Sequence, residues 1–402
     1  MGWISYALCM ISEFLFSSTP HIYQGSGIRS KLCELINDFG KKTVLVTGDS
    51  SFDNSDRCQQ LWKELSKSFE VRRIRVSGEP SPQLVDEAVA GLRDFTADSV
   101  VAIGGGSAVD AGKAIAGLLA SGDSVMEYLE GVGKGRAYSG PSTPFIAIPT
   151  TAGTGGETSK NAVLSVVGAE GFKKSFRHEM LVARHIILDP ELTLECPADL
   201  TAACGMDALT QLLESYVSSN ASPITDALAL SGLEQVRDSL VTAVEAGDDL
   251  SARSGMLYAS ALSGLTLANA GLGSVHGLAS PLGAYFPVPH GVVCGTLLFE
   301  ATQANIVAMY QREPENPSLE RYAKAGRLLT GQESLDSYAA REALLGLLQA
   351  WSGRLKMPRL AQFGVGEEDI DRIVAGSRGN SMQTNPIRLT DQEIAGIVRR
   401  RL

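Results

Sequence analysis

The residues with the clearest chemical potential are a carboxylate and two histidines in the second half of the chain. Asp207 lies in a helical pattern, and Gln211 follows four residues later on the same face of the expected helix. His276 and His290 are each followed by glycine, in a chain with only five histidines. Aspartate and imidazole are ligands for divalent cations. Isolated histidines are more often structural, so spacing alone leaves both interpretations open.

A glycine-rich turn, Gly104-Gly105-Gly106-Ser107, joins the apolar run Val100 to Ile103 to a helical pattern at Ala108 to Leu119. This order of strand, turn and helix brings backbone N–H groups and the positive helix end toward a phosphate. Glycine is needed because a Cβ would hold a diphosphate away. The turn therefore predicts a dinucleotide phosphate site, with a plain tight connection as the alternative.

A second polar loop, Pro149 to Asn161, here called the threonine loop, follows the apolar run Phe145 to Ile148 and contains hydroxyl residues that include Thr150, Thr151, Thr154 and Ser159. Such hydroxyls suit hydrogen bonds to phosphate, ribose or the nicotinamide amide. Two loops of this kind at successive strand ends indicate a dinucleotide in the crevice of a sheet. A solvated turn is the simpler alternative.

Four segments together resemble the iron-containing (group III) alcohol dehydrogenases. They are GGGSAVDAGKAIA, PTTAGTGGETSKNAV, MDALTQ and HGLASPLGAYFPVPHG, in the order and spacing of that family, and the similarity runs from about Ser17 to the C-terminus, including NPIRLT. The resemblance implies an N-terminal α/β dinucleotide-binding domain with a mostly parallel sheet, an all-α C-terminal domain, and an active site in the cleft between them.

The resemblance also implies a ligand set. The carboxylate ligand of the family falls on Asp207, its two later histidine ligands on His276 and His290, and its remaining ligand, usually histidine, on Gln211. Glutamine is a weaker donor than imidazole, so iron(II), zinc and the absence of a metal all stay open. A histidine often given a role in proton transfer falls on Ser280, which passes a proton only through water or a ribose hydroxyl.

The implied reaction is hydride transfer between NAD(P)H and a small aldehyde or alcohol whose oxygen is polarised by the metal. The expected diphosphate contacts are Gly105, Gly106 and Ser107, and the expected contacts of the nicotinamide half are Thr150, Thr151 and Thr154. Further expected cofactor contacts are Asp110, Ser159 and Lys174. A lysine in the charged pair Lys173-Lys174 is, however, more often simply solvated.

The choice between NAD and NADP depends on the residues after the first strand. Gly48 leaves room for a 2′-phosphate, whereas Asp49 and Glu79 would repel one. The balance slightly favours NAD.

The elements that must position these residues divide the chain in two. Short β-branched runs alternate with helical patterns from Lys42 to about Pro190, and long Ala- and Leu-rich helical patterns follow from about Ala198. We therefore expect a dinucleotide-binding domain over residues 1–196, with residues 1–16 as an extension, and a helical catalytic domain over residues 197–402. The Gly- and Pro-rich stretch from Gly131 to Pro144 is expected to be a mobile loop.

Composition narrows the class of protein. A net charge of −10 argues against a nucleic-acid partner, and the apolar stretch from Trp3 to Phe16 is too short to span a membrane and lacks the basic start of an export signal. The six cysteines form no CxxC pair, which favours a reducing cytoplasm. The family resemblance suggests a homodimer or larger assembly.

Three alternatives keep the same fold. One is a metal-independent reductase similar to the maleylacetate reductases, and another is a non-catalytic dinucleotide-binding protein, suggested by Gln211 and Ser280. A third, a lyase similar to dehydroquinate synthase, would need basic residues beside the histidines that the sequence lacks. The substrate itself stays open, including whether it carries an anionic group.

Overall fold

A six-stranded parallel sheet forms the first half of the protein in a computed structural model that describes residues 13–17 and 19–402. The expected extension over residues 1–16 lies mostly outside the described residues. The strand order is β1-β8-β5-β4-β2-β3. The strands are β1 (His21–Gln24), β2 (Lys42–Gly48), β3 (Glu70–Val76), β4 (Ser99–Gly104), β5 (Phe145–Pro149) and β8 (His185–Leu188).

Helices cover both faces of this sheet because alternate strand residues point in opposite directions. On one face, Leu45 and Ile103 pack with residues of α1 and α3, and on the other, Val46 and Ala102 pack with residues of α4 and α5. The helices of this half are α1 (Leu32–Asn37), α2 (Ser50–Asn54), α3 (Asp56–Ser68), α4 (Pro82–Gly91) and α5 (Gly106–Leu118).

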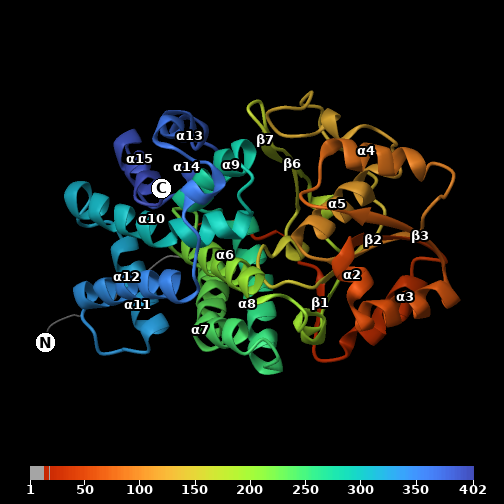
Figure 1. The fold of residues 1–402 in the computed structure, drawn as a ribbon, viewed down its shortest axis with the longest axis horizontal. Helices are drawn as coiled ribbons and strands as arrows, with labels where there is room; N and C mark the ends of the chain where they lie inside the picture. Colours follow the sequence, from red (N-terminus) through yellow and green to blue (C-terminus); the bar gives the residue numbers. More distant parts are fainter. Residues whose placement is uncertain (1–12, 18) are drawn as a thin grey trace, which may run out of the picture.

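Ten α-helices make up most of the second half, which Figure 1 shows beside the sheet in green to blue. They are α6 (Ala198–Val217), α7 (Pro223–Glu245), α8 (Leu250–Ala270), α9 (Ser274–Tyr285), α10 (His290–Arg312), α11 (Ser318–Thr330), α12 (Ser337–Arg354), α13 (Ile370–Gly376), α14 (Asn380–Gln383) and α15 (Asp391–Arg399). Their apolar faces form one continuous core. The predicted fold class, a parallel α/β half followed by a helical half, is confirmed.

The sequence did not predict two parts of the first half. β1 is short, polar and mostly exposed, so it carries no apolar alternation. An antiparallel hairpin of β6 (Asn161–Val166) and β7 (Phe172–Arg177) also extends from the threonine loop toward the helical half, where β7 contacts α9. The division at residues 196/197 stays a prediction; the last strand ends at Leu188 and α6 begins at Ala198.

One helix among the described residues, α10, is long and apolar enough to cross a membrane. Its most apolar window is 78% buried inside the protein. The apolar surface of α10 therefore belongs to the core of the helical half.

Candidate active site

A cleft of about 2090 Å³ runs along the carboxyl ends of β2, β4 and β5 and continues against α9 and the start of α10. The crevice beyond the carboxyl ends of parallel strands is where α/β sheets bind ligands. All twelve residues expected to contact a cofactor line it, namely Gly48, Asp49, Glu79, Gly105, Gly106, Ser107, Asp110, Thr150, Thr151, Thr154, Ser159 and Lys174.

The glycine turn and the threonine loop lie against each other at the floor of this cleft. β4 ends at Gly104 and α5 begins at Gly106, so the first N–H groups of α5 face the cleft. A Cβ on Gly106 would lie 3.0 Å from Oγ1 of Thr154, and one on Gly105 would lie 3.4 Å from Oγ1 of Thr151. The two segments therefore form one continuous polar surface.

Lys113 holds the threonine loop in its shape. This residue of α5 is fully buried, and its Nζ donates to the carbonyl oxygens of Gly156 (2.5 Å), Ser159 (2.9 Å) and Asn161 (2.7 Å). Burial lowers the pKa of Lys113 to about 8 and raises that of the neighbouring Glu157 to about 7. The loop is therefore organised around a buried amino group on the helix that carries the glycine turn.

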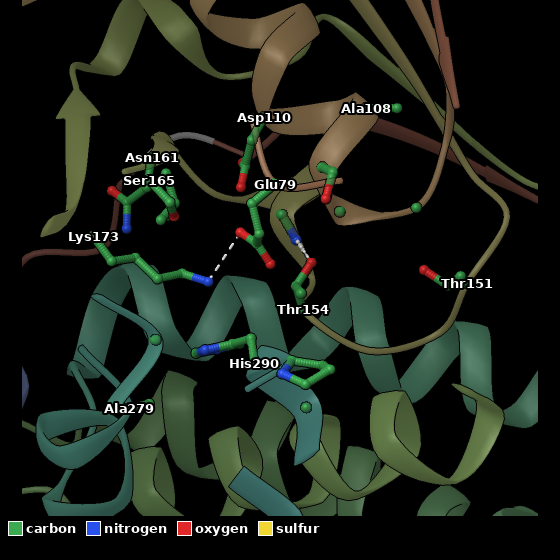
Figure 2. A pocket seen from close by; sticks show the side chains of 18 of the residues that line it. Glu79, Ala108, Asp110, Thr151, Thr154, Asn161, Ser165, Lys173, Ala279 and His290 are labelled. Carbon is green, nitrogen blue, oxygen red and sulfur yellow. Dashed lines mark hydrogen bonds and ion pairs between the residues drawn. The ribbon is translucent and has the colours of Figure 1, made fainter. Parts of the chain in front are cut away.

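Lys173 of β7 projects into the cleft between Glu79 and His290, as Figure 2 shows. Its Nζ lies 3.0 Å from Oε2 of Glu79, and only 11% of its side chain is exposed. The charge of Lys173 holds the pKa of Glu79 below its usual value although desolvation would raise it, and desolvation raises the pKa of Asp110 to about 7.

The positions of Glu79 and Lys174, both expected to contact the cofactor, differ within the cleft. Glu79 faces His290 and Lys173, at the end of the cleft nearest the histidines, and its expected contact with the cofactor stays a prediction. The side chain of Lys174 points away from that of Lys173. It lies over Gly131, where an added Cβ would be 3.9 Å from Cε and Nζ of Lys174. Lys173, which the sequence interpretation passed over, is the lysine beside the histidines.

A cluster of four potential metal ligands lies at this end of the cleft. Asp207 of α6, His276 of α9, and His290 and Cys294 of α10 place their ligand atoms within 4.8 Å of one another. Oδ1 of Asp207 lies 3.3 Å from Nε2 of His276 and 3.8 Å from Nε2 of His290. Ligand atoms about 2.1 Å from one metal ion in a tetrahedron are separated by about 3.4 Å, so the spacing fits a divalent cation.

Glu214 orients one of these ligands. Its Oε2 lies 2.7 Å from Nδ1 of His276, and its Oε1 accepts from the backbone N–H of Val275 at 2.7 Å. A carboxylate on one ring nitrogen leaves the other free to bind metal. Nε2 of His276 accordingly faces Asp207.

Two members of the cluster, Asp207 and His290, have ionisation states that suit a cation, whereas burial raises the pKa of the Cys294 thiol to about 12. Burial would raise the pKa of Asp207, but His290 and His276 hold it well below its usual range, so the carboxylate is charged. Burial lowers the pKa of His290 to about 4, which keeps its imidazole neutral, and its Nδ1 has no partner among the described residues. A charged carboxylate and a neutral imidazole are the forms that bind metals.

The two positions where the family histidines are replaced make other contacts. Gln211 is buried, with its Nε2 3.2 Å from Oδ1 of Asp207 and its Oε1 accepting from Oγ of Ser263 at 3.1 Å. Ser280 lines the cleft, and its Oγ donates to the carbonyl oxygen of Lys173 at 3.4 Å.

Cys294 is the residue of the cluster that the sequence interpretation missed. It follows His290 by four residues, and that spacing places both side chains on one face of α10. The same i, i+4 rule that paired Asp207 with Gln211 could have identified it.

Glycine- and threonine-rich loops at the ends of parallel strands, facing a buried cluster of potential metal ligands, are typical of a dinucleotide-dependent oxidoreductase with a candidate metal site. A family model described as iron-containing alcohol dehydrogenase matches residues 19–190, and one described as Fe-containing alcohol dehydrogenase family, C-terminal, matches residues 201–402. The chain belongs to the iron-containing alcohol dehydrogenase family, which confirms the resemblance and the predicted class of enzyme.

Individual relatives cover nearly the whole chain. The NAD-dependent methanol dehydrogenase of Bacillus methanolicus is 31% identical over 392 residues, 96% of this chain and 99% of that protein. A crystal structure of 1,3-propanediol oxidoreductase has a TM-score of 0.87 at 30% identity and covers 97% of this chain and 100% of its own. Sulfoacetaldehyde reductase from Bifidobacterium kashiwanohense, solved in complex with NAD+, has a TM-score of 0.82 at 27% identity, with 97% and 99% covered.

Proposed function

We propose that this enzyme transfers a hydride between NAD(H) and a small uncharged aldehyde or alcohol. The observation that carries the proposal is that both cofactor loops and both histidines of the metal cluster line one cleft. A dinucleotide lying along the loops would bring its nicotinamide end to the histidines.

Each part of the cleft has a separate task. The backbone N–H groups of Gly105, Gly106 and Ser107 would bind the diphosphate, and Thr150, Thr151 and Thr154 would orient the nicotinamide half. A divalent cation held by Asp207, His276 and His290 would supply a Lewis acid that stabilises negative charge on the substrate oxygen. The apolar wall of Leu272, Phe286 and Val288 on the helical side helps to exclude water.

The expected cofactor is NAD. Asp49 directly follows β2 and lines the cleft, where a carboxylate accepts a hydrogen bond from a ribose 2′-OH and repels a 2′-phosphate. Two relatives support this choice, because the methanol dehydrogenase is NAD-dependent and the sulfoacetaldehyde reductase was solved in complex with NAD+.

The charge distribution favours an uncharged substrate. Among the described residues, the helical half contributes no lysine or arginine to the cleft lining. On the sheet side, Lys173 beside the histidines is already paired with Glu79. A carboxylate or sulfonate substrate would have to break that ion pair, so we expect this enzyme to differ from the sulfoacetaldehyde reductase in its substrate.

Steady-state oxidation of NADH and NADPH with propanal and with succinic semialdehyde tests these points. We expect a higher kcat/KM for NADH and for propanal, together with about one bound metal ion per chain, and loss of activity on chelation that the metal restores. Activity that persists in metal-free protein would instead support a metal-independent reductase of the maleylacetate reductase type. A shift in NADH fluorescence without consumption would support a non-catalytic binding protein.

We also propose that the enzyme is a cytoplasmic homodimer or larger assembly. Among the described residues β1 forms an edge of the sheet, where Ile22 is exposed, and a strand edge of this kind favours pairing with a second chain. Light scattering would measure the assembly.

A further inference from the structure

The metal cluster contains one position where the family resemblance and the structure point to different ligands. The resemblance puts the remaining ligand on Gln211, and the structure also offers Cys294. The two differ chemically: a glutamine would bind through a neutral oxygen, and a cysteine through a soft, charged thiolate.

The hydrogen bonds of Gln211 turn its oxygen away from the cluster. An ionised Asp207 only accepts hydrogen bonds, so the group of Gln211 that faces it must be the amide nitrogen, which lies 3.2 Å from Oδ1. The oxygen of the amide accepts from Ser263 on α8. An amide N–H has no lone pair to offer a cation, so Gln211 in this orientation steadies Asp207 and donates nothing to a metal.

Cys294 instead points its sulfur at the other ligands. Its Sγ lies 3.6 Å from Nε2 of His276 and 3.8 Å from Nε2 of His290. Sulfur and nitrogen atoms that bind one zinc ion in a tetrahedron are separated by about 3.6 Å. A buried cysteine that only filled space would be surrounded by apolar side chains, whereas this sulfur meets two imidazoles.

Charge balance favours the same ligand. A divalent cation bound to Asp207, two neutral imidazoles and a neutral amide would leave one uncompensated positive charge in a buried site. Two anionic ligands, Asp207 and the Cys294 thiolate, neutralise the cation, and burial penalises net charge strongly.

We infer that Cys294, and not Gln211, completes the metal site with Asp207, His276 and His290, and that the site takes zinc in preference to iron. The inference rests on the proposed function only in that the enzyme binds a divalent metal. Thiolate ligation selects for zinc over harder cations. Cys294 on α10 thereby takes the place of the histidine that the family usually has at the position of Gln211 on α6.

Cobalt(II) titrated into metal-free protein gives a direct readout, because thiolate-to-cobalt charge transfer absorbs in the near ultraviolet. We expect this band in the wild type and its loss in Cys294→Ser, with cobalt affinity lowered at least about a hundredfold. Gln211→Leu should keep the band. Cys204→Ser is the matched control, because Cys204 lines the cleft but stands outside the cluster, and it should also keep the band.

X-ray absorption at the zinc edge of the wild-type protein needs no variant, and one sulfur among the ligands is the expected result. Stoichiometric metal without a sulfur ligand, or a band that survives in Cys294→Ser, would overturn the assignment of Cys294 and leave the proposed function intact. Protein that oxidises NADH but binds neither zinc nor cobalt would overturn the metal site itself.

Discussion

Replacing Gly264 by alanine should test whether the contact between the two halves of the protein positions the cofactor loop. Gly264 of α8 faces Gly155 of the threonine loop, and a Cβ on Gly264 would lie 2.0 Å from the carbonyl oxygen of Gly155 and 2.2 Å from Oγ1 of Thr158. That hydroxyl donates to the carbonyl oxygen of Ala261, also on α8, at 3.0 Å. The loop and α8 therefore meet backbone to backbone.

The size of the effect follows from one stabilising and two destabilising contributions. Glycine to alanine within a helix stabilises it by about 1 kcal/mol. Against this, the loop must retreat by about 1.4 Å to restore a contact of about 3.4 Å, and such overpacking costs roughly 1–3 kcal/mol. Loss of the hydrogen bond from Thr158 costs about 1 kcal/mol more. Gly264→Ala should therefore be destabilised by roughly 1–3 kcal/mol.

Catalysis should suffer more than stability. A displacement of about 1 Å in a positioning loop can lower rates about a hundredfold, so we expect kcat with NADH to fall between about tenfold and a hundredfold. The matched control is Gly346→Ala in α12, where a Cβ would meet nothing within 4 Å. It should be stabilised by up to about 1 kcal/mol with unchanged kinetics.

Urea unfolding and steady-state kinetics on the two variants make the comparison. If Gly264→Ala behaves like Gly346→Ala in both assays, the loop does not depend on this contact and the reasoning is refuted.

Three further substitutions test the groups behind the active site. Burial raises the pKa of Glu157 to about 7, so the folded protein holds that proton more tightly than the unfolded chain, and the associated stability is present at acid pH and lost as the pH rises through 7. Glutamine does not titrate, so the free energy of unfolding of Glu157→Gln should rise relative to that of the wild type by roughly 2–3 kcal/mol between about pH 5 and about pH 8. A difference that stays constant with pH would contradict this. Glu214→Gln should lower zinc affinity about 10- to 100-fold in chelator competition, because an amide holds His276 less well, and an unchanged affinity would rule out that role. Lys113→Met should leave three buried carbonyls without a donor and lower stability by at least about 3 kcal/mol, so an unaltered thermal transition would speak against it.

The fold could be predicted from the sequence because its signals are local. The central residues of β2 (44–46), β4 (100–103) and β5 (145–148) are all apolar, as is typical of strands buried on both faces. β6 and β7 carry polar residues on a partly exposed hairpin, which lacks that pattern. Missing the hairpin also hid Lys173, because without β7 nothing in the sequence distinguishes it from Lys174.

The candidate site was predictable only as far as the family pattern extends. That pattern located Asp207, His276 and His290, which the structure brings together. It could not show how the chain adjusts where the pattern fails, since the orientation of the Gln211 amide depends on Ser263 on another helix. Glu79 lies three residues beyond β3, and only its pairing with Lys173 shows which end of the cleft it faces.

The buried amino group of Lys113 has a consequence for the thermodynamics of cofactor binding. Its three carbonyl contacts fold the threonine loop around a positive charge that belongs to the protein, much as a bound potassium ion would. The loop is ordered before any dinucleotide arrives. The entropy cost of ordering it therefore arises during folding and does not weaken cofactor binding. The enzyme should therefore bind its cofactor as a nearly rigid receptor, with a small entropy penalty and fast association.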